Sequence, residues 1–591
     1  MKNVYLFQPQ YVVEFQNKPN YWLPYSAGCL WSYASQFTDI VDNFQLAGLY
    51  FRRDPIEQVI GDLDEPVLCG FSCYMWNEQY CLELARQVKI KFPNCVIIFG
   101  GPQSSSQMYA HQFIDAIVMA EGEESFVKIL RSILHNNTLD ELYPADRLQD
   151  LDIPSPYLTG VFDNIILANP DAVWAMTLET NRGCPYACTF CDWGGVTYSK
   201  IKRFGLERVD SELEWAATHQ VAYIFCADAN FGIFVERDLE ISRLMRQRAE
   251  NSAIEVINIQ YAKNSTDAIF EIAKTLGPYG RGVTVSVQSM NESTLEAIKR
   301  KNLDVNNIRE VMQLSEQHQV PTYTEVIIGL PLETKHTWIQ GLCELLELGQ
   351  HNSIDIWFAQ MLENSELATA QSRQQYGLKT IWVKDYMNLD SRDRGAVAEQ
   401  TEIIAGTNTM TTDDIIEGYV YAWMIIHWHI MGYTQIIARY ARQVKNIAYQ
   451  TLYDQLFKLI STSTIFQEHY HIIRNKTYQY LTQGVIDGVG GHAIHSISYE
   501  FMYQHQQHAA ELALAALSML TEVDQDLIEL QRSFIVNFDQ QYPLTLITSY
   551  NIITGAQEST MYKFTAKSSS AIGDFYTARR KGLIKNRMET L

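Results

Sequence analysis

The chain has 591 residues, of which 47% are hydrophobic and 19% are charged, and its formal net charge is −22. This length exceeds what one hydrophobic core supports, so we expect roughly two to four domains. The acidic balance opposes non-specific binding to nucleic acid or to an anionic membrane, because both attract Lys and Arg. A small molecule, a peptide or a basic partner suits this charge better.

The sequence start has no apolar block typical of a signal peptide, and no run of about 18 apolar residues could span a bilayer. We therefore expect a cytoplasmic protein without a membrane partner. Cysteines in such a chain are more typical of buried thiols or metal ligands than of disulfides. Seven of the ten are scattered among apolar neighbours and are expected in the core: Cys29, Cys69, Cys73, Cys81, Cys95, Cys226 and Cys343.

Residues 1–135 alternate short apolar runs with helical patterns, which is typical of an open parallel α/β sheet, here a Rossmann-like domain. The expected helices include 77–92 and 125–134. Ligands bind such sheets at the carboxyl ends of the strands, so the turns there are candidate sites. The expected strands are 4–7, 45–51, 67–72, 95–99 and 116–119.

The remainder of the chain divides by pattern into three parts. Residues 136–170 contain prolines and little periodicity, and we interpret them as a linker. Residues 171–410 repeat a strand–helix pattern six times, which predicts a partial (β/α)6 barrel rather than the usual eight units. Residues 411–591 carry long helical patterns, such as 412–439 and 496–520, and predict a mostly helical domain. The six expected barrel strands are 174–180, 222–228, 254–260, 283–288, 322–328 and 354–360.

Three cysteines, Cys184, Cys188 and Cys191, lie within eight residues of one another, directly after the first expected barrel strand. Thiolates at this spacing select an iron–sulfur cluster or zinc. A structural zinc ion normally takes four protein ligands, and the nearest histidine is His219. Three thiolates instead leave one iron of a [4Fe-4S] cluster open to a small molecule.

The Cys-x3-Cys-x2-Cys spacing on this loop resembles the radical S-adenosylmethionine (SAM) superfamily. The resemblance implies that the open iron binds the amino and carboxylate groups of SAM, and that the reduced cluster cleaves SAM to a 5′-deoxyadenosyl radical. An external low-potential electron donor is then required. Phe190 is expected near the adenine, and later strand ends supply the other expected SAM-binding residues: Asp228, Asn230, Gln288 and Glu325.

An α/β domain ahead of such a barrel resembles the cobalamin-binding class of that superfamily, over roughly residues 1–365. Four landmarks occur in the class's order, at 23–28, 70–77, 99–103 and 121–126. They carry the residues that the resemblance implies for cobalamin binding: Tyr25, Ser72, Tyr74, Trp76, Asn77, Gly100, Gly101, Pro102, Gln103, Glu121 and Gly122.

Trp76 is expected to pack under the corrin and Asn77 to hydrogen bond its amide edge; the alternative for Trp76 is a core anchor between sheet and helix. No histidine precedes His111, which excludes a protein histidine as the lower cobalt ligand from the first two-thirds of the sheet. The cofactor is therefore expected to bind without histidine ligation.

The resemblance implies a cobalamin-dependent radical SAM C-methyltransferase, which moves a methyl group from SAM via methylcobalamin to an unactivated substrate carbon. A second hypothesis keeps these cofactors but catalyses a cyclisation, rearrangement or oxidation. A third is a non-catalytic scaffold whose cysteines bind zinc. The C-terminal domain is expected to shape the substrate pocket, but no motif in it identifies a small-molecule or peptide substrate.

Overall fold

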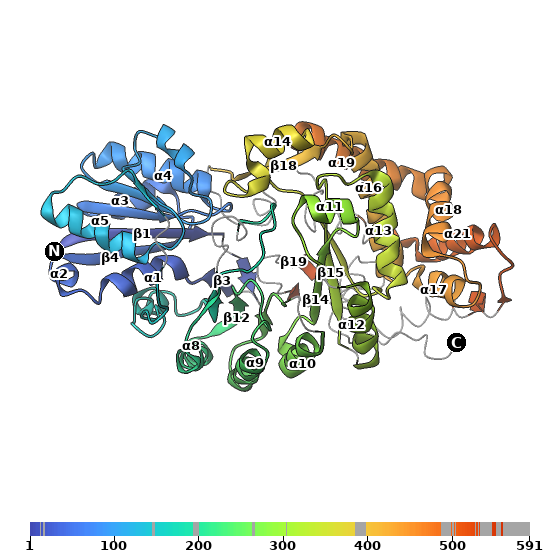
Figure 1. Ribbon diagram of the computed structural model, residues 1–591, viewed down its shortest axis with the longest axis horizontal. Coiled ribbons are helices and arrows are strands. Elements are labelled where there is room, and N and C mark those ends of the chain that lie inside the picture. The colour runs from blue at the N-terminus through green and yellow to red at the C-terminus, as the bar shows by residue number, and fades with distance from the viewer. Residues whose placement is uncertain are drawn as a thin grey trace. The chain divides into compact units, whose positions relative to one another are not determined.

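The structure is a computed structural model with two compact units, each described by itself below (Figure 1). The first unit comprises Met1–Gln260, Met361–Thr369 and Lys384–Thr401, and the second comprises Tyr261–Gln360, Ala370–Val383 and Glu402–Leu591. The described residues are 1–531, except 12, 16–17, 145–147, 193–199, 263–265, 303, 319, 385–396, 486–497, 499–500, 503, 526 and 530, together with 547–550 and 557–559.

The first unit begins with a six-stranded parallel sheet in the order β4-β1-β5-β6-β7-β8. Figure 1 labels β1 and β4 of this sheet. The five predicted strands are all present, and β8 is an addition too short to show a period. The strands are β1 (Lys2–Gln10), β4 (Phe44–Arg52), β5 (Pro66–Ser72), β6 (Val96–Gly100), β7 (Ala116–Val118) and β8 (Leu142–Tyr143). The helices between them are α1 (Tyr25–Ala34), α2 (Thr38–Val41), α3 (Ile56–Asp62), α4 (Glu78–Lys91) and α5 (Glu123–His135), with the 3-10 turn η1 (Ser106–Ala110).

Alternation along β1 explains why both faces of this sheet are covered. Successive side chains of a strand point to opposite faces. Val4 and Leu6 enter the core cluster that includes residues of α1 and α5, whereas Tyr5 and Phe7 enter the cluster that includes residues of α3 and α4. A strand buried on both faces carries a continuous apolar run, and this is the pattern in the sequence.

The strand order reverses between β1 and β5, which makes their carboxyl ends the switch point of the sheet. Ligands of doubly wound sheets bind in the crevice at such a point. The loop from Ser72 to Asn77 leaves β5 at this edge, and the turn from Gly100 to Gln103 leaves β6 beside it. The topology therefore gathers two of the four landmarks at one edge.

Three of the six predicted barrel strands lie in a second sheet of the first unit, ordered β13-β12-β9-β3-β2. The sequence did not predict β3, which pairs in parallel with β9 although it contains Pro19 and is only five residues long. The strands are β2 (Val13–Phe15), β3 (Lys18–Trp22), β9 (Val173–Leu178), β12 (Val221–Cys226) and β13 (Val256–Asn258). The other elements are α6 (Asp163–Leu167), α8 (Leu206–Thr218), α9 (Val235–Ala249), η3 (Glu366–Ala368) and the ribbon of β10 (Asn181–Arg182) and β11 (Lys202–Arg203).

The other three predicted barrel strands form the parallel sheet β14-β15-β16 of the second unit. Hydrogen bonding among the described strands thus gives two open sheets and no closed barrel. The strands of this unit are β14 (Val283–Gln288), β15 (Thr322–Ile328), β16 (Ile354–Phe358), β17 (Lys379–Lys384) and β18 (Gln400–Gly406), with β19 (Ile547–Tyr550) and β20 (Gln557–Ser559) near the chain end. Its helices up to the C-terminal part are α10 (Thr266–Leu276), η2 (Gly277–Tyr279), α11 (Glu292–Ala297), α12 (Val305–His318), α13 (Lys335–Glu347) and α14 (Ala370–Tyr376).

The described C-terminal part is mostly helical, as predicted, but the helical pattern over 412–439 does not form one continuous α-helix. Thr411 caps its start, with its hydroxyl accepting from the Asp414 amide at 3.2 Å. The helix then widens into a π-helical turn and ends near Gly432, whose φ of +95° is left-handed and favours glycine. The elements are α16 (Thr412–Met424), the π-helix η4 (Ile425–Ile430), α17 (Gln435–Gln443), α18 (Tyr449–Thr462), α19 (Phe466–Gln483) and α21 (Gln506–Ser518). No helix of the described chain is both long and apolar enough to cross a bilayer.

A buried ion pair fixes the return of the chain to the first unit just before β18. Arg53 Nη1 lies 2.5 Å from Glu399 Oε1, and both side chains are almost completely buried. Glu399 also accepts from the amides of Gln79 at 2.7 Å and Tyr80 at 3.1 Å, in the first turn of α4. A carboxylate there satisfies amides that the helix cannot pair.

We predict that Glu399→Ala destabilises the first unit by about 3–5 kcal/mol, because it leaves the Arg53 guanidinium buried without its counter-ion. Chemical denaturation followed by tryptophan fluorescence measures this loss. Glu83→Ala, which removes the partner of Arg86 in an exposed pair of α4, is the control and should leave the midpoint near that of the wild type. Equal midpoints for the two variants would contradict an anchoring role for Glu399.

Candidate active site

The cysteine loop follows β9 and β10 in the first unit. Cys184 and Cys188 are buried, Cys191 is half-buried, and none of the ten cysteines is in a disulfide. The seven others are buried, which confirms the core interpretation. Gly183, with φ of +110°, makes the turn into the loop. Asp192, next to the last thiol, is buried enough to raise its pKa to about 6.

Asp228, at the carboxyl end of β12, anchors the start of this loop. Its carboxylate accepts from the amides of Thr180 at 2.8 Å and Asn181 at 3.1 Å, and from the side chains of the same two residues. These four donors occupy both oxygens of a side chain that is 1% exposed. Burial raises the pKa of Asp228 to about 7, although these hydrogen bonds favour the ionised form. Asp228 therefore holds the loop rather than presenting a free carboxylate.

Asn230 connects the same strand end directly to the thiols. Its Nδ2 donates to Cys184 Sγ at 3.4 Å, and its side chain is buried. Its Oδ1 has no partner among the described residues, nor has the buried hydroxyl of Thr189 inside the cysteine loop. Phe190, one residue further, is half-buried.

The other two expected SAM-binding residues lie in the second unit. Gln288 ends β14 with φ of +65°, a left-handed conformation that is uncommon outside glycine and concentrates at functional sites. Glu325, on the neighbouring strand β15, accepts from Ser286 Oγ at 2.5 Å. Burial raises the pKa of Glu325 above its ordinary value.

Arg182 connects the cysteine loop to the first sheet. Its Nη1 lies 2.8 Å from Glu123 Oε1, at the start of α5, and its Nε lies 2.9 Å from Glu179 Oε2, just after β9. Burial lowers the pKa of Arg182, but Glu179 and Glu123 outweigh it and hold the pKa well above its ordinary value. Tyr25, an expected cobalamin-binding residue, donates to the same Glu179 oxygen at 2.9 Å.

Tyr74 and Trp76 form an aromatic pair on the loop after β5. Their rings stack with centroids 4.5 Å apart and an interplanar angle of 12°. Tyr74 OH lies 2.6 Å from Ser26 Oγ at the start of α1, which fixes the pair to a second element. Both rings are half-buried, and Trp76 Nε1 is buried with no hydrogen-bond partner among the described residues.

Asn77, next to this pair, is fully buried and its amide serves the loop's own backbone. Its Oδ1 accepts from the Tyr74 amide at 2.7 Å, and its Nδ2 donates to the carbonyls of Pro9 at 3.0 Å and Ser72 at 3.1 Å. The structure thus shows Asn77 shaping the loop that carries Trp76. A hydrogen bond from this side chain to a corrin amide would require these contacts to break.

The turn after β6 packs tightly against the loop after β5. The Cys73 amide donates to the Gly100 carbonyl at 2.7 Å, and the Gln103 amide donates to the Cys73 carbonyl at 3.1 Å. Gly101 has φ of +99°, and a Cβ there would lie 2.6 Å from the Cys73 oxygen, so only glycine fits. Pro102 is exposed at the tip of this turn.

The last landmark, Glu121 and Gly122, precedes α5. Glu121 Oε2 accepts from the Leu148 amide at 2.8 Å, and burial raises the pKa of Glu121. The Gly122 carbonyl accepts from the Phe126 amide at 2.8 Å and begins the helix. Both residues therefore have local structural partners.

These surroundings fit the cofactors that the sequence implies. Buried polar groups are nearly always hydrogen-bonded, so unpaired ones beside the thiols (Asn230, Thr189) and at the sheet edge (Trp76) call for a partner that is not protein. Among the described residues no three His, Cys, Asp or Glu side chains converge closely enough to bind one metal ion. A [4Fe-4S] cluster does not require such convergence, because each cysteine binds a different iron atom.

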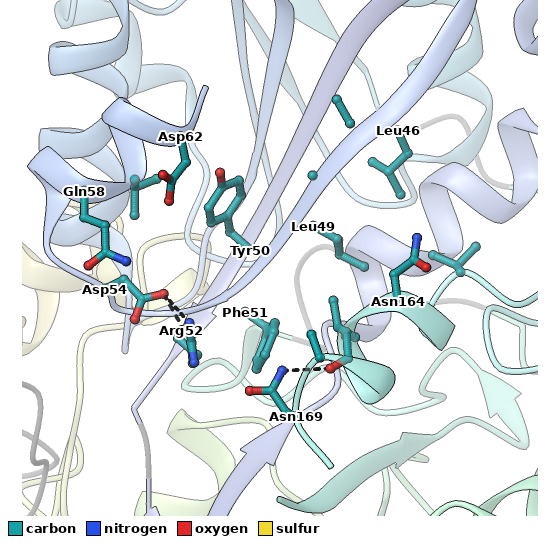
Figure 2. A pocket seen from close by; sticks show the side chains of 16 residues that line it. Leu46, Leu49, Tyr50, Phe51, Arg52, Asp54, Gln58, Asp62, Asn164 and Asn169 are labelled. Carbon is teal, nitrogen blue, oxygen red and sulfur yellow. Dashed lines mark hydrogen bonds and ion pairs between the residues drawn. The ribbon is translucent and has the colours of Figure 1, made fainter. Parts of the chain in front are cut away.

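A cavity of about 310 Å³ in the first unit lies away from these residues, along β4. Figure 2 shows Tyr50 and Phe51 from the strand, Asp54 and Gln58 from the segment that follows, and Asn164 from α6 around it. None of the expected cofactor residues lines it. The cavity is therefore distinct from the edge that carries the landmarks.

Three residues that organise the site escaped the sequence analysis: Arg53, Arg182 and Glu399. Arg53 Nη1 donates to the Trp76 carbonyl at 3.0 Å, which ties the buried Arg53–Glu399 pair to the loop of the aromatic pair. Arg182 lies outside the four landmarks, although it pairs with Glu123 in the last of them. Their sequence neighbours gave no sign of burial: Arg53 stands between Arg52 and Asp54, and Arg182 between Asn181 and Gly183.

Comparison with known proteins places this geometry in a family. Residues 178–341 match the Radical SAM superfamily. The chain is 34% identical to the 2-(S-pantetheinyl)-carbapenam-3-carboxylate methyltransferase of Streptantibioticus cattleyicolor, over 73% of this chain and 67% of that enzyme. It is also 34% identical to the cobalamin-dependent radical SAM methyltransferase TokK of Streptomyces tokunonensis, with the same coverage.

A solved structure shares the overall fold. The cobalamin-dependent SAM radical enzyme OxsB, with aqua-cobalamin and SAM bound, superposes with a TM-score of 0.50 at 15% identity, over 91% of this chain and 84% of that one. This fold likeness agrees with the α/β architecture described above. The chain belongs to the cobalamin-dependent radical SAM methyltransferases, enzymes that use a [4Fe-4S] cluster, SAM and cobalamin.

Proposed function

We propose that this chain transfers the methyl group of SAM, by way of cobalamin, to an unactivated carbon of a carbapenam carboxylate. The observation that carries the proposal is the loop of three unlinked thiols, anchored by Asp228, in a chain 34% identical to a carbapenam methyltransferase. When bound, the cluster supplies radical cleavage of SAM, and cobalamin supplies the methyl carrier. The protein supplies position, burial and hydrogen bonds.

The thiolates of Cys184, Cys188 and Cys191 would hold three irons of the cluster. Asn230, through its N–H···Sγ contact, would stabilise the negative charge on Cys184 and tune the cluster potential, as hydrogen bonds to cluster sulfurs do. We propose that the free Oδ1 of Asn230 contacts the methionine part of SAM and that the side chain of Phe190 contacts the adenine. We also propose Gln288 and Glu325 as SAM-binding residues.

Cobalamin would lie at the carboxyl edge of the first sheet, over the Tyr74–Trp76 pair and the Gly100–Gly101 backbone. Trp76 offers an apolar face and a free indole N–H, and Gly101 allows the backbone to approach a large flat cofactor closely. Asn77 and Asp228 are positioning residues in this proposal, because their side chains are engaged by the loops they shape.

We assign one role to each of the predicted domains. Residues 1–135 would bind cobalamin, 136–170 would link, 171–410 would hold the cluster and SAM, and 411–591 would shape the substrate pocket. The reducing electron would come from an external low-potential donor. With a net charge of −22, we propose a cytoplasmic enzyme that binds neither nucleic acid nor a membrane.

Each single substitution Cys184→Ser, Cys188→Ser or Cys191→Ser should lower bound iron from about four atoms per chain to below about one, because a cluster with two thiolates is not retained. Iron analysis and the electron paramagnetic resonance (EPR) signal of the reduced, anaerobically prepared protein measure this. Cys343→Ser is the matched control, because that thiol is buried beside Tyr421 and should not affect iron. Iron retained by the triple serine variant would refute the cluster assignment.

Anaerobic incubation of the full chain with SAM, hydroxocobalamin, a low-potential reductant and 2-(S-pantetheinyl)-carbapenam-3-carboxylate should give a product one CH2 heavier. Mass spectrometry should detect both S-adenosylhomocysteine and 5′-deoxyadenosine, because methyl transfer and radical formation each consume SAM. The Cys188→Ser protein is the control. A product of unchanged or lower mass with 5′-deoxyadenosine alone would favour cyclisation, rearrangement or oxidation instead.

Trp76→Ala should weaken cobalamin binding by on the order of tenfold, because a half-buried indole contributes about 1–2 kcal/mol of apolar contact to a flat ligand. Absorbance titration with hydroxocobalamin measures the affinity. Trp382→Ala, at an exposed tryptophan of β17, should leave both affinity and iron content unchanged. If Trp76 is only a core anchor, its variant will lose stability but retain wild-type cobalamin affinity when folded.

A further inference from the structure

A short segment of the first unit contacts both proposed cofactor loops. Residues 363–367, here called the coupling segment, follow β16 in the chain. Asn364 Nδ2 donates to the carbonyls of Pro102 at 2.7 Å and Ser104 at 2.9 Å, in the turn after β6. One amide group thus holds two carbonyls of the turn at the sheet edge.

The coupling segment has a second contact to that turn and one to the cysteine loop. Ser105 Oγ donates to Glu363 Oε1 at 2.9 Å. At the other end, the Leu367 amide donates to the Thr189 carbonyl at 2.8 Å, between Cys188 and Phe190, and the Leu367 side chain is fully buried. Five consecutive residues therefore link the cysteine loop to the turn after β6.

Three unpaired hydroxyls lie on the same three pieces of chain. Ser104 lies at the turn after β6, Thr189 in the cysteine loop and Ser365 in the coupling segment. Each side chain is at least nine-tenths buried and has no partner among the described residues. Buried hydroxyls without partners are costly, so these three are available to hydrogen bond non-protein groups bound at these contacts.

We propose that the coupling segment sets the separation between the cluster and cobalamin, with Asn364 as the principal positioning residue. The inference rests on the proposed function and adds a residue that fixes geometry between two cofactors. In a methyl transfer through a substrate radical, the radical carbon must meet the methyl carrier, and misplacement of about 1 Å can lower a rate by about 100-fold. A rigid link between the two loops limits such misplacement.

Asparagine suits this position because its side-chain NH2 has two hydrogens, one for each carbonyl. Aspartate has nearly the same shape but only acceptor oxygens, which would repel the Pro102 and Ser104 carbonyls. Asn364→Asp therefore removes the link with little change in volume. Ser105→Ala removes the neighbouring contact and serves as a second, milder variant. Asn169→Ala is the matched control, because that amide donates to the Ile165 carbonyl at the end of α6.

The test measures the dipolar interaction between the reduced cluster and cob(II)alamin by pulsed EPR, using the full chain loaded with iron, sulfide and hydroxocobalamin and then reduced. We expect one narrow distance distribution for the wild type and for Asn169→Ala. The distribution should be about twofold broader for Asn364→Asp and intermediate for Ser105→Ala, at unchanged iron and cobalamin content. With the carbapenam substrate, 5′-deoxyadenosine formed per methyl transferred should rise by on the order of tenfold.

Wild-type distributions in both Asn364→Asp and Ser105→Ala would overturn the inference. So would broadening in Asn169→Ala equal to that in Asn364→Asp, because general loosening would then explain it. Failure of the proposed function looks different: the wild type would bind no cluster or no cobalamin, or would give no methylated product, before any variant is compared.

Discussion

The ion pairs of Arg182 are the interaction on which the first unit's site depends. A guanidinium with a side chain only 14% exposed lies between Glu123 and Glu179, at 2.8 and 2.9 Å. Taking these charges out of water costs several kcal/mol per ion, and only close geometry with further hydrogen bonds offsets that cost. Here the α5 N-terminus favours the Glu123 carboxylate, and Tyr25 donates to Glu179. Because Arg182 is two residues before Cys184, the thiol loop cannot shift without breaking charges that are buried with it.

Two of the site's most buried polar side chains, Asp228 and Asn77, are occupied by the loops beside them rather than presenting free groups. Asp228 accepts four hydrogen bonds from Thr180 and Asn181, and Asn77 makes three with its own loop and Pro9. Loops at strand ends lack the ladder hydrogen bonds of the sheet, so their amides and carbonyls need other partners. Meeting that need with fully buried side chains leaves each loop with one conformation. The groups that remain unpaired, such as Asn230 Oδ1 and Trp76 Nε1, are then held in place without protein partners of their own.

Local patterns predicted the features that depend on local sequence. The apolar runs of β1, β5, β6 and β7 revealed the parallel sheet, because strands buried on both faces need continuous apolar residues. The edge strand β4 is buried only at Phe44 and Phe51. The cysteine spacing predicted the loop that we propose as the cluster site, since one short segment supplies all three thiols. Contacts such as Arg53–Glu399, separated by 346 positions, leave no period or motif for a single sequence to reveal. The same holds for β3, whose place beside β9 depends on pairing rather than on alternation. The sequence predicted the strand ends correctly. It could not predict the orientation of the Asn77 side chain, because this depends on the Pro9 and Ser72 carbonyls.

The two kinds of link between the loops have different physical consequences. Arg182 acts through charge in a buried setting, where loss of one partner leaves an uncompensated ion and costs several kcal/mol. Asn364 and the Leu367 amide act through hydrogen bonds to carbonyls, each worth about 1 kcal/mol net, so their loss loosens geometry while the fold persists. The ion pairs of Arg182 thus keep the cysteine loop folded, and the hydrogen bonds of Asn364 and Leu367 determine its exact position. Losing these hydrogen bonds should therefore affect a reaction that depends on sub-ångström placement more than it affects the stability of the fold.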